Sequence, residues 1–244
     1  MAPAYHDAGD KKRDMGRSKK VRLSVLVPAY NEQKTLRQVL MLLRAQKDVY
    51  EIIVIDDASR DKTFSIAKKL KSKKIRVFKH IKNKGKGAAI QTGLHNVRGT
   101  HVLIQDADLE YDPREIPVLL KPIRNGRAAV VFGSRFYGQH STMFYWHYVG
   151  NKFLNFILNI LYNVTLSDME TCYKVLPIDV MKSLQLKEND FRIEPEIACK
   201  LILRGEKIFE VPITYVSRTY EEGKKITWKD GFHALKTIVS LRFQ

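Results

Sequence analysis

Two hydrophobic patterns alternate along most of the chain, and together they predict alternating strands and helices. Short apolar runs closed by polar residues, typical of buried strands, cover residues 23–27, 51–55, 75–80, 102–104 and 129–132. Between these runs apolar residues recur at helical spacing, as Leu36, Leu40 and Leu43 do after the first one. Such alternation predicts parallel strands joined by right-handed crossovers. We therefore expect an α/β fold in which helices flank the sheet.

Polar residues able to do chemistry follow the first, second and fourth predicted strands. They are Pro28-Ala29-Tyr30-Asn31-Glu32, Asp56-Asp57-Ala58-Ser59-Arg60-Asp61 and Gln105-Asp106-Ala107-Asp108-Leu109-Glu110. In a parallel sheet the carboxyl ends of these strands lie on one edge, where the ligands of open α/β folds bind. The three segments should therefore meet in one crevice. We also expect Asn31 to cap the helix that follows it.

The segment after the fourth strand carries three acidic residues at alternate positions. Because side chains alternate along an extended chain, Asp106, Asp108 and Glu110 are expected to point the same way. Carboxylates gathered in this manner suit Mg²⁺ or Mn²⁺, which bind through one or two carboxylates together with substrate phosphates. The alternative is a solvated acidic turn at a strand end, since Asp112-Pro113 close by is an ordinary turn signal.

Two basic features could meet a phosphate at the same edge. Gly85-Lys86-Gly87 lies in a turn that opens a helix, where backbone amides and Lys84 or Lys86 can reach an anion. The turn lacks the spacing and the Ser or Thr of a Walker loop, so a merely flexible turn is the alternative. Arg135 follows Gly133-Ser134 at the end of the fifth strand and suits either a phosphate or a surface ion pair.

A helical segment from Met143 to Leu166 is apolar except for one stripe of asparagines at 151, 155, 159 and 163. It is too interrupted to span a bilayer but apolar enough to lie in the membrane interface, with Trp146 at headgroup level. A helix buried against the sheet is the alternative. The last segment, 227–244, combines apolar residues at helical spacing with lysines and is typical of an amphipathic basic helix.

Composition favours an anionic partner. The 244 residues carry a formal net charge of +17, which suits a phosphorylated substrate, an anionic membrane surface or nucleic acid. Residues 1–20 combine cations with small polar residues, which predicts a flexible basic tail. The sequence shows neither a membrane-spanning apolar run nor the core of a signal peptide. We therefore expect a protein on the cytosolic side, peripheral to the endoplasmic reticulum or plasma membrane.

Taken in order, these motifs resemble the family 2 glycosyltransferases with a GT-A fold, and among them the dolichol-phosphate mannose synthase-like, or polyprenyl-phosphate glycosyltransferase, branch. The resemblance covers about residues 22–226 and includes the stretch from Arg218 to Lys225. It implies one GT-A domain over 21–226, with a Rossmann-like, mixed and mostly parallel sheet flanked by helices and with amphipathic helices at a membrane surface. It also implies a dolichyl-phosphate mannosyltransferase-like hexosyltransferase that uses Mg²⁺ or Mn²⁺.

The resemblance further implies roles for particular residues. The metal is expected at Asp106, Asp108 and Glu110. The donor nucleotide is expected at Pro28, Tyr30, Glu32, Asp57 and Asp106, together with Lys86 of the glycine-lysine turn. The acceptor phosphate is expected at Arg135, Arg218 and either Lys224 or Lys225, and Arg135, Arg218 and Lys224 join Asp106 and Asp108 as the catalytic set. The expected partners are a nucleotide-diphosphate sugar of the GDP-mannose or UDP-glucose type, a polyprenyl phosphate, an anionic membrane surface and a small membrane-anchoring subunit.

The reaction implied is inverting transfer of a hexose to a polyisoprenyl phosphate, whose oxygen is already anionic and requires cations rather than a strong base. One alternative is a glycan hydroxyl as acceptor, which requires a general base, and Asp168 or Glu170 is the candidate. The other is a basic nucleic-acid-binding protein, although zinc-finger spacing, helix-turn-helix signatures and RNA-binding aromatic motifs are absent from the sequence. We therefore expect no nucleic-acid partner.

Overall fold

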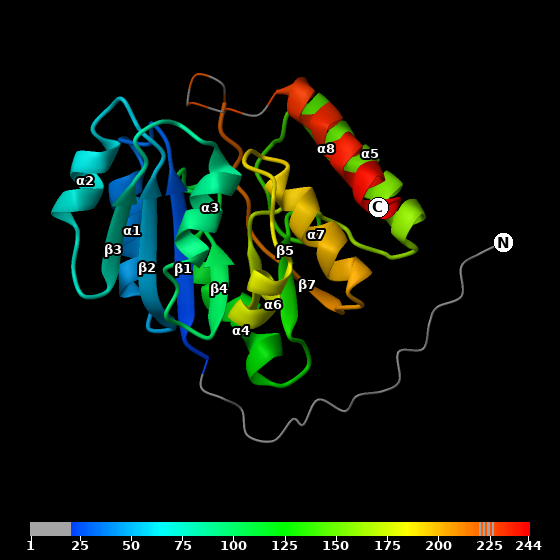
Figure 1. Ribbon diagram of the computed structural model, residues 1–244, viewed down its shortest axis with the longest axis horizontal. Coiled ribbons are helices and arrows are strands. Elements are labelled where there is room, and N and C mark those ends of the chain that lie inside the picture. The colour runs from blue at the N-terminus through cyan, green and yellow to red at the C-terminus, as the bar shows by residue number, and fades with distance from the viewer. Residues whose placement is uncertain (1–20, 220, 222, 224, 226) are drawn as a thin grey trace.

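Seven strands form one sheet in the computed structural model of the chain (Figure 1). They are β1 (Leu23–Ala29), β2 (Val49–Asp56), β3 (Ile75–Lys79), β4 (His101–Ile104), β5 (Val130–Ser134), β6 (Lys174–Pro177) and β7 (Ile208–Pro212). Their order across the sheet is β3-β2-β1-β4-β6-β5-β7. Strand β6 runs antiparallel to β4 and β5, whereas the other neighbouring pairs are parallel. The expectation of a mixed, mostly parallel sheet is confirmed.

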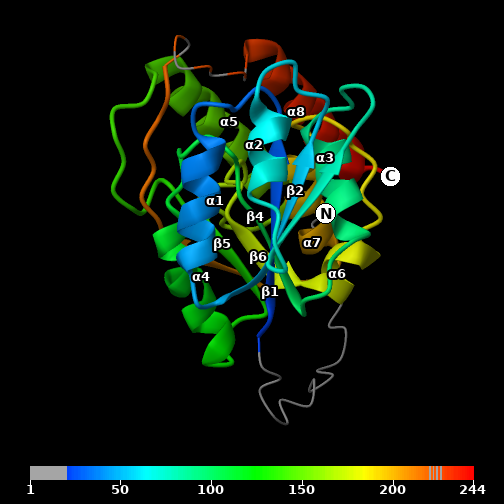
Figure 2. The ribbon, with the colours of Figure 1, turned by 90° about the vertical axis from the view of Figure 1, so that its left-hand side faces the viewer.

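Helices cover both faces of this sheet. They are α1 (Leu36–Ala45), α2 (Thr63–Lys69), α3 (Lys86–Leu94), α4 (Ile116–Arg124), α5 (Tyr145–Tyr162), α6 (Ile178–Ser183), α7 (Ile193–Leu203) and α8 (Trp228–Arg242), with a 3-10 turn, η1 (Pro113–Glu115), before α4. Figure 2 shows α1 and α4 on one side of the strands and α3, α6 and α7 on the other. Helices α5 and α8 pack against each other and against α7.

The structure describes residues 21–219, 221, 223, 225 and 227–244. Over this part of the chain no helix is long and apolar enough to cross a bilayer. Residues 1–20, for which the sequence predicts a basic tail, lie outside the described residues, so that prediction stays untested. Helix α8 falls within the segment 227–244 that the sequence predicts to be helical.

Aliphatic side chains explain where the central strands form. In β1 the side chains of Leu23, Val25 and Leu26 are completely buried, and in β2 the run from Ile52 to Ile55 is completely buried as well. Strands covered by helices on both faces have no solvent side, so they consist of continuous apolar runs instead of alternating ones. These runs end at the same edge of the sheet, which places the polar segments after them together.

Strand β6 is an element that the sequence pattern misses, as is the short helix α6 after it. It begins at Lys174, whose side chain is fully buried. A lysine argues against a buried strand because an ammonium group removed from water needs a charged partner. Here that partner is Glu194, from the first turn of α7. A short strand that depends on a partner twenty residues away carries no local signal.

Asn31 does not cap α1, so the capping prediction is wrong. Its backbone adopts a φ of 53°, its side-chain oxygen accepts a hydrogen bond from the amide of Arg60 at 2.9 Å, and its own amide donates to Ser59 at 3.0 Å. Helix α1 begins only at Leu36, after Thr35. Asn31 instead ties the loop after β1 to the loop after β2, and both loops contribute to the site described below.

The turn before α3 is packed on two sides. Asp57 accepts hydrogen bonds from the amides of Lys84, at 2.9 Å, and Gly85, at 2.7 Å. Gly85 adopts a φ of 96°, a conformation that favours glycine. A Cβ on Gly87 would lie 2.2 Å from the carbonyl oxygen of Glu188. This glycine-lysine turn is therefore a fixed part of the fold, in contrast to the flexible turn that the sequence left open.

Gly87→Ala is expected to destabilise the fold by about 2 kcal/mol, because the added methyl group meets a backbone carbonyl that cannot move aside alone. The matched control is Gly150→Ala in α5, where a Cβ would meet nothing within 4 Å and better helix propensity should stabilise by about 0.5–1 kcal/mol. Urea unfolding of both variants measures the difference. Equal changes in unfolding free energy would contradict the close packing at the start of α3.

Candidate functional site

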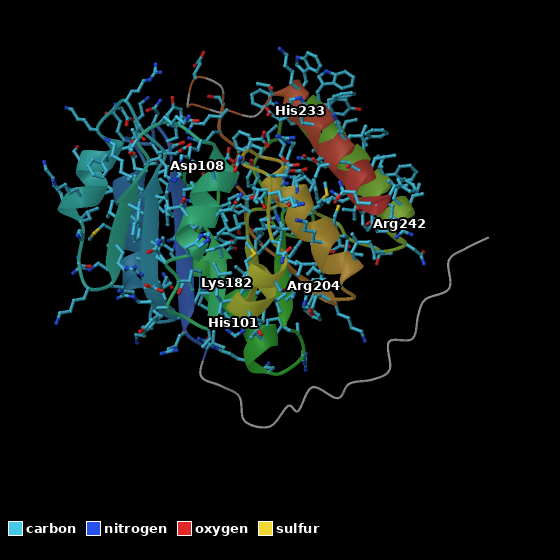
Figure 3. The ribbon with its side chains drawn as sticks, viewed as in Figure 1. His101, Asp108, Lys182, Arg204, His233 and Arg242 are labelled. Carbon is cyan, nitrogen blue, oxygen red and sulfur yellow. The ribbon has the colours of Figure 1, made fainter. Side chains whose placement is uncertain are left out.

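A cavity of about 420 Å³ brings together most of the residues that the sequence singles out. Its lining includes Pro28, Tyr30, Glu32, Asp57, Lys86, Asp106, Asp108, Glu110, Arg135, Glu170 and Arg218. Figure 3 shows Asp108 and His101 at opposite ends of β4, so the cavity lies at the carboxyl edge of the sheet. Asp168 is not among the lining residues, and Lys224 falls outside the residues that the structure describes.

Asp106, Asp108 and Glu110 lie on a turn and not on an extended chain. Strand β4 ends at Ile104, and Leu109 adopts a φ of 65°, so the alternation of side chains expected along a strand is wrong here. The three carboxylates are nevertheless close to one another. Burial, and after it the charges of Asp106 and Glu110, raise the pKa of Asp108 to about 7. This excess of buried negative charge requires cations nearby.

Arg218 and Lys225 bring two cations to the acidic turn. The Arg218 guanidinium lies 2.8 Å from Asp108 and 3.1 Å from Glu32, and the Arg218 amide donates to Glu110 at 3.0 Å. Burial by itself would lower the pKa of Arg218, but the charges of these three carboxylates raise it. Lys225 Nζ lies 2.6 Å from Glu32 Oε1. The segment after β7 thus reaches over the loops after β1 and β4.

Lys86 brings a third cation, from the N-terminus of α3. Its Nζ lies 2.8 Å from Asp106 Oδ1 and 3.0 Å from Glu194 Oε1. Burial acts to lower the pKa of Lys86, but the two carboxylates raise it well above its ordinary value. For Asp106, burial is the largest single effect and acts to raise the pKa, but the charge and hydrogen bond of Lys86, together with the hydrogen bond of Cys172 and the charge of Arg218, lower the pKa overall. The pair therefore stays ionised.

The carboxylates of the acidic turn fit a divalent cation in chemical type. Hard oxygen donors suit Mg²⁺ and Mn²⁺, and one or two carboxylates suffice when substrate phosphates complete the coordination shell. Among the described residues, no group of three or more His, Cys, Asp or Glu side chains is arranged to hold a metal ion. Asp106 faces Lys86 and Asp108 faces Arg218 in place of a common centre. A divalent cation would have to replace the Lys86 and Arg218 side chains as the partner of these two carboxylates.

Asp57 makes hydrogen bonds within the protein that the sequence does not predict. Besides the amides of Lys84 and Gly85, it faces His80, whose Nδ1 lies 2.7 Å from Asp57 Oδ1. His80 Nε2 in turn lies 2.9 Å from Thr92 Oγ1 in α3. Asp57 also lines the cavity. One carboxylate therefore both shapes the cavity and holds the turn that carries Lys86.

Arg135 and Asp168 form a buried pair in another wall of the site. Asp168 is fully buried, and it accepts hydrogen bonds from Arg135 Nε at 2.8 Å, Nη2 at 2.7 Å and the backbone amide at 2.9 Å. The Arg135 guanidinium also stacks 5.2 Å from the ring centre of Tyr215. Because both carboxylate oxygens are bound to a permanently charged guanidinium, Asp168 is an anchor for Arg135 and a poor general base.

Glu170, two residues later, does line the cavity. Its Oε1 is buried and has no hydrogen-bond partner in the structure. Burial is the main reason that the pKa of Glu170 is raised to about 7, against the opposing charge of Lys174. A carboxyl group with this pKa and an unused oxygen can accept a proton or a hydrogen bond from a ligand.

The sequence does not indicate three residues that lie around the cavity. The hydroxyl of Tyr215 donates to Glu110 at 2.9 Å, Glu194 holds Lys86, and Lys174 holds Glu194. Tyr215 lies in residues 208–216, where apolar and polar residues alternate and predict only a strand, and an acidic residue in the first turn of a helix is common. Since the Tyr215 contact spans 105 positions along the chain, nothing in the local sequence indicates it.

Comparison with known proteins agrees with this geometry. Residues 24–184 match the family model described as glycosyl transferase family 2. A dolichol-phosphate mannosyltransferase of Pyrococcus furiosus is 30% identical over 237 residues, which cover 91% of this chain and 64% of that protein. The low-salt glycan biosynthesis hexosyltransferase Agl6 of Haloferax volcanii is 29% identical over 223 residues, which cover 89% of this chain and 53% of that protein. The chain thus spans less than two thirds of the length of either relative.

Solved structures share the fold at lower identity. Glucosyl-3-phosphoglycerate synthase from Mycobacterium tuberculosis, in complex with Mn²⁺, UDP-glucose and phosphoglyceric acid, matches with a TM-score of 0.74 and 20% identity over 91% of this chain and 80% of that one. The same synthase in complex with UDP matches with a TM-score of 0.72 and 19% identity, with the same coverage. The expected GT-A fold is confirmed.

Asp168→Asn is expected to lower the unfolding free energy by about 3 kcal/mol, because it leaves the Arg135 charge buried without a counter-ion. The matched control is Asp112→Asn, which removes a carboxylate paired with Arg114, whose side chain is 72% exposed, and should cost less than about 1 kcal/mol. Denaturant unfolding compares the two variants. A loss no larger for Asp168→Asn than for Asp112→Asn would contradict the anchoring role.

Proposed function

The chain belongs to glycosyl transferase family 2, and we propose that it transfers a hexose, with inversion, from a nucleotide-diphosphate sugar to a polyprenyl phosphate at a membrane surface. The observation that carries this proposal is one cavity lined both by the carboxylates of the acidic turn and by the arginines Arg135 and Arg218. Carboxylates suit a metal-bound pyrophosphate, and arginines suit a second phosphate. The two relatives, named for dolichol-phosphate mannosyl transfer and for hexosyl transfer, support these substrate classes.

The donor is assigned to the part of the cavity built by the loops after β1 and β2. Pro28 and Tyr30 offer an apolar and aromatic lining for a base, while Glu32 and Asp57 offer carboxylate acceptors for the base or ribose. Lys86 lies at the N-terminus of α3, where helix amides and the ammonium both favour an anion. A pyrophosphate bound there would give Lys86 a third anionic partner beside Asp106 and Glu194.

Mg²⁺ or Mn²⁺ would be held by Asp106 and Asp108 with Glu110 beside them, and when bound it supplies positive charge for the departing nucleoside diphosphate. The synthase of similar fold was solved with Mn²⁺ and with Mg²⁺ in the presence of UDP, which supports this choice of metals. Arg218, which pairs with Asp108 in the structure, would lose that partner if a divalent cation were bound there. Its guanidinium is then available to a phosphate of the acceptor.

A phosphate acceptor fits the rest of the cavity without a strong base. Arg135 is held in place by Asp168 and Tyr215, so the side chain loses little freedom when it binds an anion. Arg135 and Arg218 would hold the acceptor phosphate against the donor, although the acceptor and the donor are both negatively charged. The attacking oxygen is already ionised near neutral pH. The remaining task is to exclude water and to align the two substrates.

Glu170 supports a second candidate acceptor, a glycan hydroxyl. A hydroxyl must lose its proton during attack, and the unused buried oxygen of Glu170, on a group with a pKa of about 7, is placed to take it. Only the ionised form accepts a proton. Transfer to a hydroxyl would therefore rise as the pH rises through about 7, whereas transfer to a phosphate would not depend on this group.

The test compares acceptors that differ by one phosphate. With Mn²⁺ and labelled GDP-mannose or UDP-glucose, the chain is expected to glycosylate a polyprenyl phosphate and not the matching polyprenol. Glu170→Gln should retain this activity within about threefold, because no base is required. Transfer to the alcohol that disappears in Glu170→Gln would establish the hydroxyl acceptor instead.

The same assay includes a variant of the acidic turn. Asp106→Asn combined with Asp108→Asn should lower transfer by at least about 100-fold through loss of the metal, while Asp112→Asn, just beyond the turn, should leave it unchanged. Circular dichroism confirms that the variants are folded. Parental transfer rates in the double variant would contradict the proposed function.

The outer faces of α5 and α8 support the membrane part of the proposal. Helix α5 turns its asparagines inward, where Asn155 Oδ1 accepts from the amide of Met169 at 2.8 Å and Asn159 bonds the backbone of Leu166 at 2.9 Å. Its outward residues are apolar: Tyr145, Trp146, Val149, Phe153, Phe156 and Ile160 are all exposed. This arrangement is the reverse of a helix in water and suits an apolar medium outside.

Helix α8 continues this apolar face. Trp228, Phe232, Val239 and Phe243 are exposed along it, and Lys229 and Lys236 carry positive charge beside them. Figure 1 shows α5 and α8 side by side, and Figure 3 shows His233 and Arg242 along α8. Residues of both helices, including Leu154 and Ala234, also line the cavity. An anionic bilayer against this face would place the lipid acceptor next to the site.

Replacing Trp146 and Phe232 together by serine is expected to weaken binding to phosphatidylserine-containing vesicles by at least about tenfold, because each loses the burial of a large aromatic side chain. Co-sedimentation measures the binding. The matched control is Tyr50→Ser on β2, where the aromatic residue is 46% exposed and should be without effect. Binding of the double variant at the parental level would contradict docking through α5 and α8. The vesicles contain no other protein. Binding of the unmutated chain to them would therefore show that a membrane-anchoring subunit is dispensable.

A further inference from the structure

A buried row of alternating charges runs from the acidic turn into the core. Asp106 lies 2.8 Å from Lys86 Nζ, which lies 3.0 Å from Glu194 Oε1. Glu194 Oε2 in turn pairs with the ammonium of Lys174. The side chain of Lys174 is fully buried and that of Glu194 is 4% exposed. Neither residue takes part in the transfer proposed above.

Three separate elements hold this row in place. Lys86 begins α3, Glu194 lies in the first turn of α7, and Lys174 begins β6. Lys174 also donates to the carbonyl oxygen of Thr171. A buried ammonium fixed by two partners leaves Glu194 little freedom to turn. The other oxygen of Glu194 is therefore held toward Lys86.

The Lys86 ammonium pairs with two carboxylates, Asp106 and Glu194, at similar distances. Because the Coulomb energies of the two pairs add, Glu194 attracts the ammonium from the other side and offsets part of the pull of Asp106 on it. If Glu194 lost its charge, Lys86 would pair more strongly with Asp106. A metal ion that binds Asp106 would then have to displace a more tightly held ammonium.

We propose that Glu194, fixed by Lys174, is a positioning residue that sets how strongly Lys86 competes with a divalent cation for Asp106. The inference rests on the proposed function, in which the cation and the donor pyrophosphate bind at this turn. It predicts that the charge of Glu194 has opposite effects on the two ligands. The carboxylate helps a metal cation to bind and weakens the attraction of Lys86 for a nucleoside diphosphate without metal.

Glu194→Gln tests this with two binding measurements. In the presence of GDP or UDP, whichever the parental chain binds, the affinity for Mn²⁺, followed by the electron paramagnetic resonance of the free ion, should fall by about five- to tenfold. In the absence of metal, the affinity for the same nucleoside diphosphate, measured by calorimetry, should rise by about two- to fivefold. General damage to the site would lower both affinities.

The matched control is Glu51→Gln. Glu51 has a 5% exposed side chain and pairs with Arg76 at 3.1 Å, near the start of β2 and so at the opposite edge of the sheet from the cavity. The same chemical change there should leave both affinities unaltered. Should Glu194→Gln fail to fold, the double variant Lys174→Met, Glu194→Leu removes the buried pair together and should show the same two opposite shifts.

Unchanged affinities in a folded variant, or a loss of both, overturn the positioning role. The result that would overturn the proposed function is different: a parental chain in which Mn²⁺ does not strengthen nucleoside diphosphate binding at all. The opposite shifts in Glu194→Gln, together with unshifted values in Glu51→Gln, support the inference.

Discussion

Carboxylates crowded at the end of a buried sheet repel one another and require cations beside them, and this constraint organises the site. Glu32, Asp106 and Asp108 each face a lysine or an arginine within 3.1 Å. Those cations come from the start of α3 and from the segment after β7, far from the carboxylates in sequence. The charge balance thus draws distant parts of the chain to one cavity.

The fold serves this balance by bringing strand ends to one edge. Strands β2 and β4 flank β1 and run parallel to it, so the loops after the three strands meet at one edge. Asp57 then holds the turn before α3 through two amides, and Asp168 holds Arg135 through both of its oxygens. Asp57 therefore positions the turn that carries Lys86 while it also lines the cavity, and Asp168 positions Arg135 from behind the cavity wall.

The sequence predicts the parts of this arrangement that rest on local patterns. Apolar runs locate β1, β2 and β4, and parallel order places Tyr30, Asp57 and Asp108 at one cavity. It does not predict that the acidic segment turns at Leu109, because a left-handed backbone at a leucine has no local signal. It also misses β6, whose buried Lys174 is acceptable only because Glu194 lies beside it. Contacts between residues distant in sequence decide these features, and a single sequence does not record them.

The central claim, that internal cations hold the carboxylates until a divalent cation bound together with the donor pyrophosphate replaces them, is tested most directly by titrating the parental chain with Mn²⁺ with and without a nucleoside diphosphate. Because Lys86 and Arg218 occupy Asp106 and Asp108, Mn²⁺ alone should bind weakly, and nucleotide should raise its affinity by at least about tenfold, with a reciprocal effect of Mn²⁺ on the nucleotide. Equally tight Mn²⁺ binding in the absence of nucleotide would contradict the account.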